Sequence, residues 1–287
     1  MKRRPRAILL GSGQRARVME AAEELRPHIK ATLDLVAEDF TFEQDLSSFD
    51  ADLVIVLGGD GSILQAARQM GERQIPVVGV NLGRLGFLAD IQPGDFVGHL
   101  TELQKGEYRV LEHLMLSAEV FREGKRLAAS IGLNELAVLG GPPYRIVNID
   151  LYIDEEFATT YRCDGLIVST PVGSTAHSLS AGGPILQKEV QAFVISPISP
   201  HTLTVRPVVD TADRMFELRV RDPNPSTAAV VDGNLLTTLL PEDCIRVTRS
   251  RSTFRMVQLP GRSYYRTLRE KLGWGGVIEG SVGPIGG

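Results

Sequence analysis

Residues 53–57 are five consecutive aliphatic residues, and the sequence Gly-Gly-Asp-Gly follows them at once. The aliphatic run predicts a buried strand, and residues 62–73 have the pattern of a helix with Ser62 as its N-cap. The same alternation continues on either side, with strand patterns at 7–10 and 76–80 and helical patterns at 15–30 and 93–105. Continuous apolar strands that alternate with helices indicate a parallel sheet covered by helices on both faces.

After residue 106 the pattern changes to short strand-like segments separated by Gly, Pro and Asp, which predicts an all-β domain of sandwich-like type. We therefore expect an α/β, Rossmann-like domain over residues 1–106, joined by 260–287, and a β-rich domain over 107–259. A helix over 264–272 is expected to return to the first domain, before a glycine-rich, partly disordered tail. The strand-like segments are 108–121, 127–139, 145–153, 156–162, 165–169, 192–195, 203–209, 215–220, 227–231 and 244–249.

Composition excludes several classes of protein. The 287 residues are enough for roughly two domains, and the net charge of −4 provides no basic field, so nucleic acid is not an expected partner. Two cysteines cannot form a disulfide framework or a four-cysteine zinc site. The apolar residues 7–10 are too few for a signal peptide, and no aliphatic run approaches a membrane span. We expect a cytoplasmic protein with reduced thiols and no membrane partner.

The loop at residues 58–61 has the composition of an anion site. Gly58, Gly59 and Gly61 allow backbone N–H groups to approach a phosphate, and the following helix N-terminus favours negative charge. A carboxylate repels phosphate, so Asp60 is interpreted either as a general base for a hydroxyl or as a partner for phosphate-bound Mg²⁺. The alternative is a tight strand-to-helix turn in which Asp60 serves as a cap.

Residues 11–16, Gly-Ser-Gly-Gln-Arg-Ala, match the dinucleotide fingerprint G-x-G-x-x-G/A, with Asp34 about twenty residues further on. The match is short, and the alternative is simply the first strand-to-helix turn. A Rossmann cofactor site at this loop stays open as a hypothesis.

A second polar, glycine-rich block covers residues 163–184, where hydroxyls crowd the end of a predicted strand. This composition suits hydrogen bonding to a polyhydroxylated or phosphorylated ligand. Ser174, His177 and Asp164 could form a hydrolase triad, but the G-x-S-x-G elbow is missing. Asn134 and Glu135 could hold two hydroxyls of a ribose, or could lie at a solvated strand end.

Together these segments resemble the NAD kinase family, of the bacterial and archaeal ATP- or polyphosphate-dependent kind. The glycine–aspartate loop alone is shared with diacylglycerol-type lipid kinases and phosphofructokinases, whereas residues 81–88 and 164–184 make the resemblance specific. It spans about residues 53 to 275 and includes residues 58–61, 81–88, 134–135, 164–184, 197–203, 206–207, 232–233 and 265–274.

The resemblance implies an enzyme that phosphorylates the 2′-hydroxyl of the adenosine ribose of NAD to make NADP. Asp60 would accept the proton of that hydroxyl, and the oxygen would attack the γ-phosphate of ATP, or a polyphosphate, with Mg²⁺ present. No protein metal ligand is expected, because Mg²⁺ would be held through the phosphates. The resemblance also implies a homodimer or homotetramer in which a neighbouring subunit completes the pocket.

For the dinucleotide, the resemblance implies that Asn134 and Glu135 hold ribose hydroxyls and that Asp164 holds the nicotinamide carboxamide. The remaining residues that it assigns to binding are Gly58, Gly59, Gly61, Arg145, Arg162, Thr175, Ala176, His177, Ser178, Leu179, Ser180 and Asn234. Three positions depart from the usual family pattern: His177 replaces Tyr, Asn234 replaces Gln and Val172 replaces Thr. We expect these departures to affect substrate affinity rather than the reaction.

Two other functions remain as alternatives. A lipid or sugar kinase with the same loop would phosphorylate a different alcohol and leave NAD unchanged. A non-catalytic NAD-binding protein, or an oxidoreductase that uses residues 11–16, would bind NAD without turnover of ATP.

Overall fold

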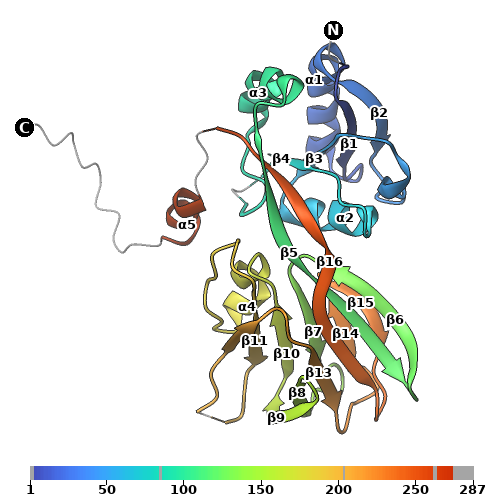
Figure 1. The fold of residues 1–287 in the computed structure, drawn as a ribbon, viewed down its shortest axis with the longest axis vertical. Helices are drawn as coiled ribbons and strands as arrows, with labels where there is room; N and C mark the ends of the chain where they lie inside the picture. The colour runs from blue at the N-terminus through green and yellow to red at the C-terminus, as the bar shows by residue number, and fades with distance from the viewer. Residues whose placement is uncertain (1–2, 84–85, 203, 261–263, 274–287) are drawn as a thin grey trace, which may run out of the picture.

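A computed structural model of the chain describes residues 3–83, 86–202, 204–260 and 264–273 (Figure 1). The expected glycine-rich tail and Trp274 lie outside these residues, as do residues 84–85 of the segment 81–88. The described chain forms an α/β half and a β-rich half that lie end to end, with helix α5 beside the junction.

The α/β half is a parallel sheet with helices on both faces, which confirms the predicted class. Its strand order is β2-β1-β3-β4. Alternate residues of β3 explain the two faces, because Leu53 and Ile55 pack with α1 and α3, whereas Val54 and Val56 pack with α2. The elements are β1 (Arg6–Gly11), α1 (Ala16–Thr32), β2 (Asp34–Asp39), β3 (Leu53–Gly58), α2 (Asp60–Met70), β4 (Val77–Asn81) and α3 (Pro93–Lys105).

In this half one strand was not predicted and one local expectation was wrong. Strand β2 had no predicted counterpart, because its sequence Asp-Leu-Val-Ala-Glu-Asp is that of a partly exposed edge strand rather than a buried one. Helix α2 begins at Asp60 with Gly59 as its N-cap, so Ser62 is the third residue of the helix and does not cap it. The earlier start places Asp60 itself in the first turn of the helix.

The β-rich half is a sandwich of two sheets, as expected. Strands β5 and β16 form a long antiparallel pair, and β16 also pairs with β4, so one sheet continues from the α/β half into the sandwich. The second sheet is antiparallel, with the order β12-β11-β10-β7-β14-β15. The strands of the first sheet are β5 (Arg109–Arg122), β6 (Lys125–Gly132), β8 (Val147–Ile153), β9 (Glu156–Cys163), β13 (Phe216–Val220) and β16 (Cys244–Gln258); those of the second are β7 (Glu135–Leu139), β10 (Gly165–Ser169), β11 (Ala192–Ile198), β12 (Val208–Thr211), β14 (Ala228–Val231) and β15 (Asn234–Thr238).

The predicted strand over 127–139 is two strands, β6 and β7, which belong to different sheets. The chain leaves the first sheet after Gly132 and enters the second at Glu135. Leu133 and Asn134 therefore lie at a corner of the sandwich, next to the junction with the α/β half.

Helix α5 (Tyr264–Leu272) reaches the α/β half, as predicted, because Lys271 lies 3.6 Å from Asp60. It also contacts the β-rich half through Tyr264, whose hydroxyl donates to the carbonyl of Leu186 at 3.1 Å. Cys163 and Cys244 are both free thiols. Among the described helices, none combines the length and hydrophobicity required to cross a membrane.

Candidate active site

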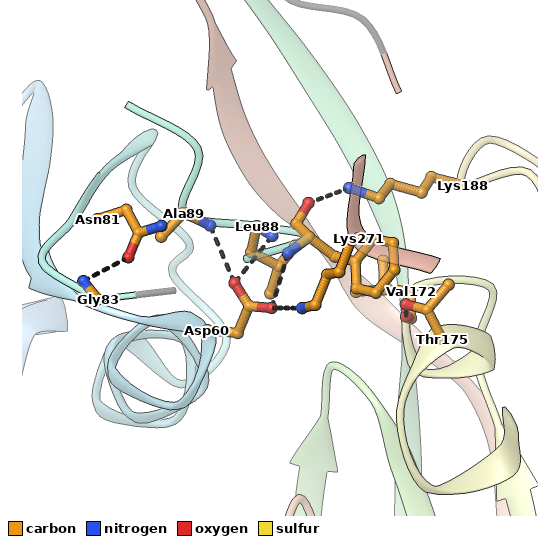
Figure 2. A network of polar contacts seen from close by, with 10 residues as sticks. Asp60, Asn81, Gly83, Leu88, Ala89, Val172, Thr175, Lys188 and Lys271 are labelled. Atoms are coloured by element: carbon orange, nitrogen blue, oxygen red, sulfur yellow. Dashed lines mark hydrogen bonds and ion pairs between the residues drawn. The ribbon is translucent and has the colours of Figure 1, made fainter. Parts of the chain in front are cut away.

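Asp60 lies at the carboxyl end of β3 and is held by the backbone of residues 87–89 (Figure 2). The N–H groups of Phe87, Leu88 and Ala89 donate to its carboxylate at 2.8, 2.9 and 3.0 Å. A Cβ atom at Gly86 would collide with the same carboxylate, so glycine is required there. The carboxylate is thus fixed in position, and because the side chain is 28% exposed it is still accessible to solvent.

Two lysines from the second half of the chain approach this segment. The Nζ atom of Lys271 lies 3.6 Å from Oδ2 of Asp60, and Lys188 donates a 2.6 Å hydrogen bond to the carbonyl of Phe87. Burial lowers the pKa of Lys188, although Asp60 and Asp90 oppose the shift. Neither lysine was predicted as a site residue, since each lies far from Asp60 in the sequence.

A cavity of about 470 Å³ opens beside Gly58 and Gly59, between the carboxyl end of β3 and the start of α1. Arg15 and Arg17 line it from the start of α1, together with Gly58 and Gly59 from the end of β3 and residues 81–83 after β4. A Cβ atom at Gly59 or at Gly61 would meet open space, so these glycines leave room for a ligand rather than for packing.

The glycines of the first loop have a structural explanation. A Cβ atom at Gly13 would lie 2.9 Å from the carbonyl oxygen of Phe40, and one at Gly11 would collide with Val18. Both glycines are therefore needed for close packing of the first strand-to-helix turn. This supports the turn interpretation of residues 11–16, and the two arginines beside them face the cavity of the glycine–aspartate loop.

Asn134 and Glu135 are held at the sandwich corner by Asp232. The Asp232 carboxylate accepts hydrogen bonds from the N–H groups of Leu133, Asn134 and Glu135 at 2.7, 2.8 and 3.0 Å. Asp232 has a left-handed φ of 47°, in the tight turn between β14 and β15. The sequence marked residues 232–233 only as part of the resemblance, and their supporting role was missed.

Glu135 is buried, with only 8% of its surface exposed, and its Oε2 atom has no hydrogen-bond partner among the described residues. Burial raises the pKa of Glu135 to about 8, and the nearby Asp232 carboxylate adds to the shift. At neutral pH the side chain is therefore largely protonated in the absence of ligand. A neutral carboxyl can both donate to and accept from a hydroxyl.

A second cavity, of about 520 Å³, lies in the β-rich half and brings together Arg145, Asp164 and His177. These three residues come from separate segments of the chain, and all three belong to the predicted set. Tyr144, which the sequence did not single out, also lines this cavity and is 85% exposed. Arg162 is exposed on β9 and does not line the cavity.

Residues 173–180 form a 3-10 turn and a short helix, α4 (His177–Ser180), after strand β10. Thr175 and Ala176 are half-buried and His177 is exposed, whereas Ser178 is fully buried with its hydroxyl 3.0 Å from that of Ser196. Ser178 therefore packs the short helix onto the sheet. Of the other predicted residues, Leu179 is half-buried and Ser180 is exposed, and Asn234 donates to the carbonyl of Asp232 at 3.1 Å.

The hydrophobic core crosses the junction and places the two halves of the site opposite each other. Val172 and Leu133 are buried in the same cluster as Ile63 of α2 and Leu88. Val172 precedes the turn at 173–175, and Ile63 lies three residues after Asp60, so this packing holds the turn against the α/β half. The hydroxyl of Thr175 donates to the carbonyl of Val172 at 3.1 Å (Figure 2). Val172 thus provides apolar packing where a threonine hydroxyl is usual in the family.

Among the residues that the structure describes, no three His, Cys, Asp or Glu side chains group together as a metal site. The described residues around Asp60 therefore form no cage of side chains for a divalent cation, which would meet the Asp60 carboxylate and the backbone of a glycine loop. Such a site fits a cation that is already bound to phosphate oxygens, as Mg²⁺ is in nucleotide complexes.

A parallel α/β sheet joined to a β-sandwich, with a held carboxylate between a glycine loop and a polar pocket, defines a two-domain phosphotransferase. A family model described as the ATP-NAD kinase N-terminal domain matches residues 13–108, and one described as the ATP-NAD kinase C-terminal domain matches residues 133–259. An NAD kinase from Rhodopirellula baltica is 56% identical over 274 residues, which cover 96% of this chain and 88% of that relative. The chain belongs to the NAD kinase family.

Two solved structures share the fold. The yeast NADH kinase complexed with NADH has a TM-score of 0.86 at 24% identity, covering 98% of this chain and 91% of that one. An NAD kinase from Archaeoglobus fulgidus in complex with ATP has a TM-score of 0.70 at 25% identity, covering 93% of this chain and 97% of that one.

Proposed function

We propose that this NAD kinase transfers the terminal phosphate of ATP to the 2′-hydroxyl of the adenosine ribose of NAD, with Asp60 as the general base. The observation that carries the proposal is the cradle of three N–H groups that fixes the Asp60 carboxylate at the carboxyl end of β3. Ligands bind at this edge of an open α/β sheet. The N–H groups contact both carboxylate oxygens, and the side chain is still 28% exposed.

NAD is expected to bind along the β-rich half. Asn134 and the neutral carboxyl of Glu135 would meet ribose hydroxyls, and Asp164, in the cavity with Arg145 and His177, would hold the nicotinamide carboxamide. The yeast relative was solved with NADH, which supports a dinucleotide site in this fold. The residues assigned to the pocket wall are Thr175, Ala176, Ser178, Leu179, Ser180 and Asn234, with Ser178 acting through packing. Arg162, which is exposed on β9, is assigned to the rim.

The phosphate donor is expected in the cavity beside the glycine–aspartate loop, where Arg15 and Arg17 provide positive charge. Gly59 and Gly61 expose backbone that can approach phosphate oxygens, and Gly58, which is packed against Ser62, lines the cavity at the end of β3. Mg²⁺ would enter as part of the donor complex, where it neutralises phosphate charge. A linear polyphosphate presents the same terminal group, so we propose that it competes for this cavity.

The chemistry requires positioning more than covalent participation, since phosphoryl transfer has a loose transition state. Asp60 takes the proton of the 2′-hydroxyl, and the oxygen forms its bond to the terminal phosphorus. The bond from that phosphorus to the bridging oxygen breaks, and the electron pair leaves with ADP.

The test is NADP formation by purified protein supplied with NAD, Mg²⁺ and either ATP or polyphosphate. We expect Asp60→Asn to lower the rate by about 10²–10⁴-fold while NAD binding is retained. The NH₂ group of Asn would face at least one of the three N–H donors at this position, so we also expect a lower Tm than that of wild type. Full activity of a folded Asp60→Asn enzyme would exclude Asp60 as the base. Phosphorylation of a lipid or sugar alcohol with NAD unchanged would instead identify the alternative kinase.

We also propose that the chain assembles as a homodimer or homotetramer. Apolar side chains are exposed on both edge strands of the second sheet, with Val208 and Val209 on β12 and Leu235 on β15. Unpaired strand edges with exposed apolar residues favour association. Light scattering coupled to size-exclusion chromatography would give the mass, and a monomer at micromolar concentration would contradict the proposal.

A further inference from the structure

Lys271 forms an ion pair with Asp60, and the sequence assigned it no role, although it lies in the segment 265–274 that the resemblance includes. Its Nζ atom lies 3.6 Å from Oδ2 of Asp60 and 4.1 Å from the centre of the Phe87 ring. Figure 2 shows the lysine reaching the carboxylate from the side opposite Ala89. The side chain is 32% exposed, so its ammonium group is open to solvent and to a ligand bound beside Asp60.

Helix α5 holds Lys271 in this place through contacts with the β-rich half. Leu268 is buried, and the hydroxyl of Tyr264 donates to the carbonyl of Leu186 at 3.1 Å. The ammonium of Lys188 lies 5.3 Å from the centre of the Tyr264 ring. These contacts anchor the first turn of the helix. Its last turn then places the Lys271 ammonium beside the Asp60 carboxylate of the α/β half.

A purely structural role explains this contact poorly. An ion pair between two partly exposed side chains contributes about 0–1 kcal/mol to stability. Three N–H groups already hold Asp60, so the lysine is not required to fix the carboxylate. Its distinguishing property is therefore its location beside Oδ2 of Asp60, which accepts one N–H group, from Phe87, whereas Oδ1 accepts two. Oδ2 is thus the oxygen with more capacity left to accept a proton from a substrate hydroxyl.

The geometry relates this ammonium to the phosphorus atom that the hydroxyl attacks. A hydroxyl that gives its proton to Asp60 lies within hydrogen-bond distance of the carboxylate, about 2.6–3.2 Å. The phosphorus is a further bond length away, and a lysine stem is flexible. The Nζ atom, 3.6 Å from Oδ2 in the free protein, is thus within reach of the oxygens of the transferring group.

We propose that Lys271 is a catalytic residue of the phosphoryl transfer, whose ammonium moves from Asp60 to the terminal phosphate of the donor when both substrates are bound. This rests on the proposed function of Asp60 as base. The move frees Oδ2 to accept the 2′-hydroxyl proton and places a positive charge on the equatorial oxygens as the bridging P–O bond breaks. Lys271 remains protonated throughout, and the electron pair of the broken bond leaves with the donor.

The test compares Lys271→Met, Lys271→Arg and Arg269→Met in steady-state kinetics with NAD and MgATP. Arg269 is the matched control, because it is exposed on the same turn of the same helix and its replacement removes the same charge. We expect Lys271→Met to lower kcat by about 10²–10³-fold, the range found when one donor to a developing charge is removed. Lys271→Arg should retain more of the activity and Arg269→Met should retain it all, with the KM for NAD within about twofold of wild type in each.

Two outcomes overturn the proposal. The first is a kcat for Lys271→Met equal to that of Arg269→Met. The second is a loss that appears mainly as a higher KM for NAD with a lower Tm, which indicates that the lysine anchors the helix. Rescue of Lys271→Ala by added ethylammonium supports direct contact with the phosphate, because an anchoring role is not restored by a free amine. Asp60→Asn, assayed in parallel, separates the two proposals: if it is fully active, the assignment of the base fails, whatever the lysine does.

Discussion

The ammonium of Lys188 donates a 2.6 Å hydrogen bond to the carbonyl of Phe87, across the junction between the two halves of the molecule. The N–H of Phe87 in turn donates to Asp60. The β-rich half therefore holds the segment that holds the proposed base. Phe87 is the link, with its carbonyl used by one half and its amide by the other.

This relationship predicts that Lys188→Met loosens the cradle of Asp60 without removing any group that touches substrate. A displacement of about 1 Å in a catalytic group can cost 10²-fold in rate, so we expect kcat to fall by about 10–10²-fold with the KM for NAD unchanged. Steady-state kinetics check this, with Lys105→Met, at an exposed position on α3, as the control. Equal kcat values for the two variants would show that the hydrogen bond from Lys188 to Phe87 is not needed for catalysis.

Local features of the fold could be predicted from the sequence, whereas contacts between distant residues could not. The strand, glycine turn and helix around Asp60 were predictable because their pattern is local, and β2 was missed because an edge strand lacks a continuous apolar run. The contacts of Asp232 with Asn134 and of Lys271 with Asp60 join residues that are far apart in the chain. Such pairs follow from how the sheets and α5 pack, and no spacing in the sequence encodes them.

Asp232 supports the ribose-binding segment, so its replacement should weaken both the fold and NAD binding. Asn has the same shape and tolerates the left-handed backbone of this position, but it presents an NH₂ group to at least one of the three N–H donors. We expect Asp232→Asn to lower the free energy of unfolding by about 1–3 kcal/mol and to raise the KM for NAD. Urea denaturation and kinetics measure the two effects, with the exposed Asp222→Asn as the control. If Asp232→Asn has the wild-type free energy of unfolding and the wild-type KM for NAD, Asp232 does not support the ribose-binding segment.

Glu135 predicts a pH dependence of stability in the ligand-free protein. Its pKa is about 8 in the folded state against 4.5 for a free side chain, because burial disfavours the charged form. The stabilisation that comes from the bound proton is fully present below pH 4.5 and is lost as the pH rises through about 8. Glu135→Gln, which stays neutral, should therefore show a smaller fall in Tm between pH 6 and pH 9 than wild type. Thermal unfolding across this range measures the difference, and parallel curves would show that Glu135 is already ionised at pH 6.

Replacing Gly61 by Ala should affect binding of the phosphate donor without lowering the stability of the protein. It lies in the first turn of α2 with a negative φ, and an added Cβ atom would meet open space within the protein. In a helix, Ala is more stable than Gly by roughly 0.5–1 kcal/mol, so Gly61→Ala should not lower the Tm. If the donor phosphates approach this backbone, the added methyl group obstructs them. We therefore expect the KM for ATP to rise about tenfold or more, which corresponds to a loss of about 1.4 kcal/mol of binding free energy. Kinetics at saturating NAD test this against Gly98→Ala, a glycine of helix α3 whose Cβ atom would also meet open space. An unchanged KM for ATP in Gly61→Ala would place the donor away from the glycine–aspartate loop.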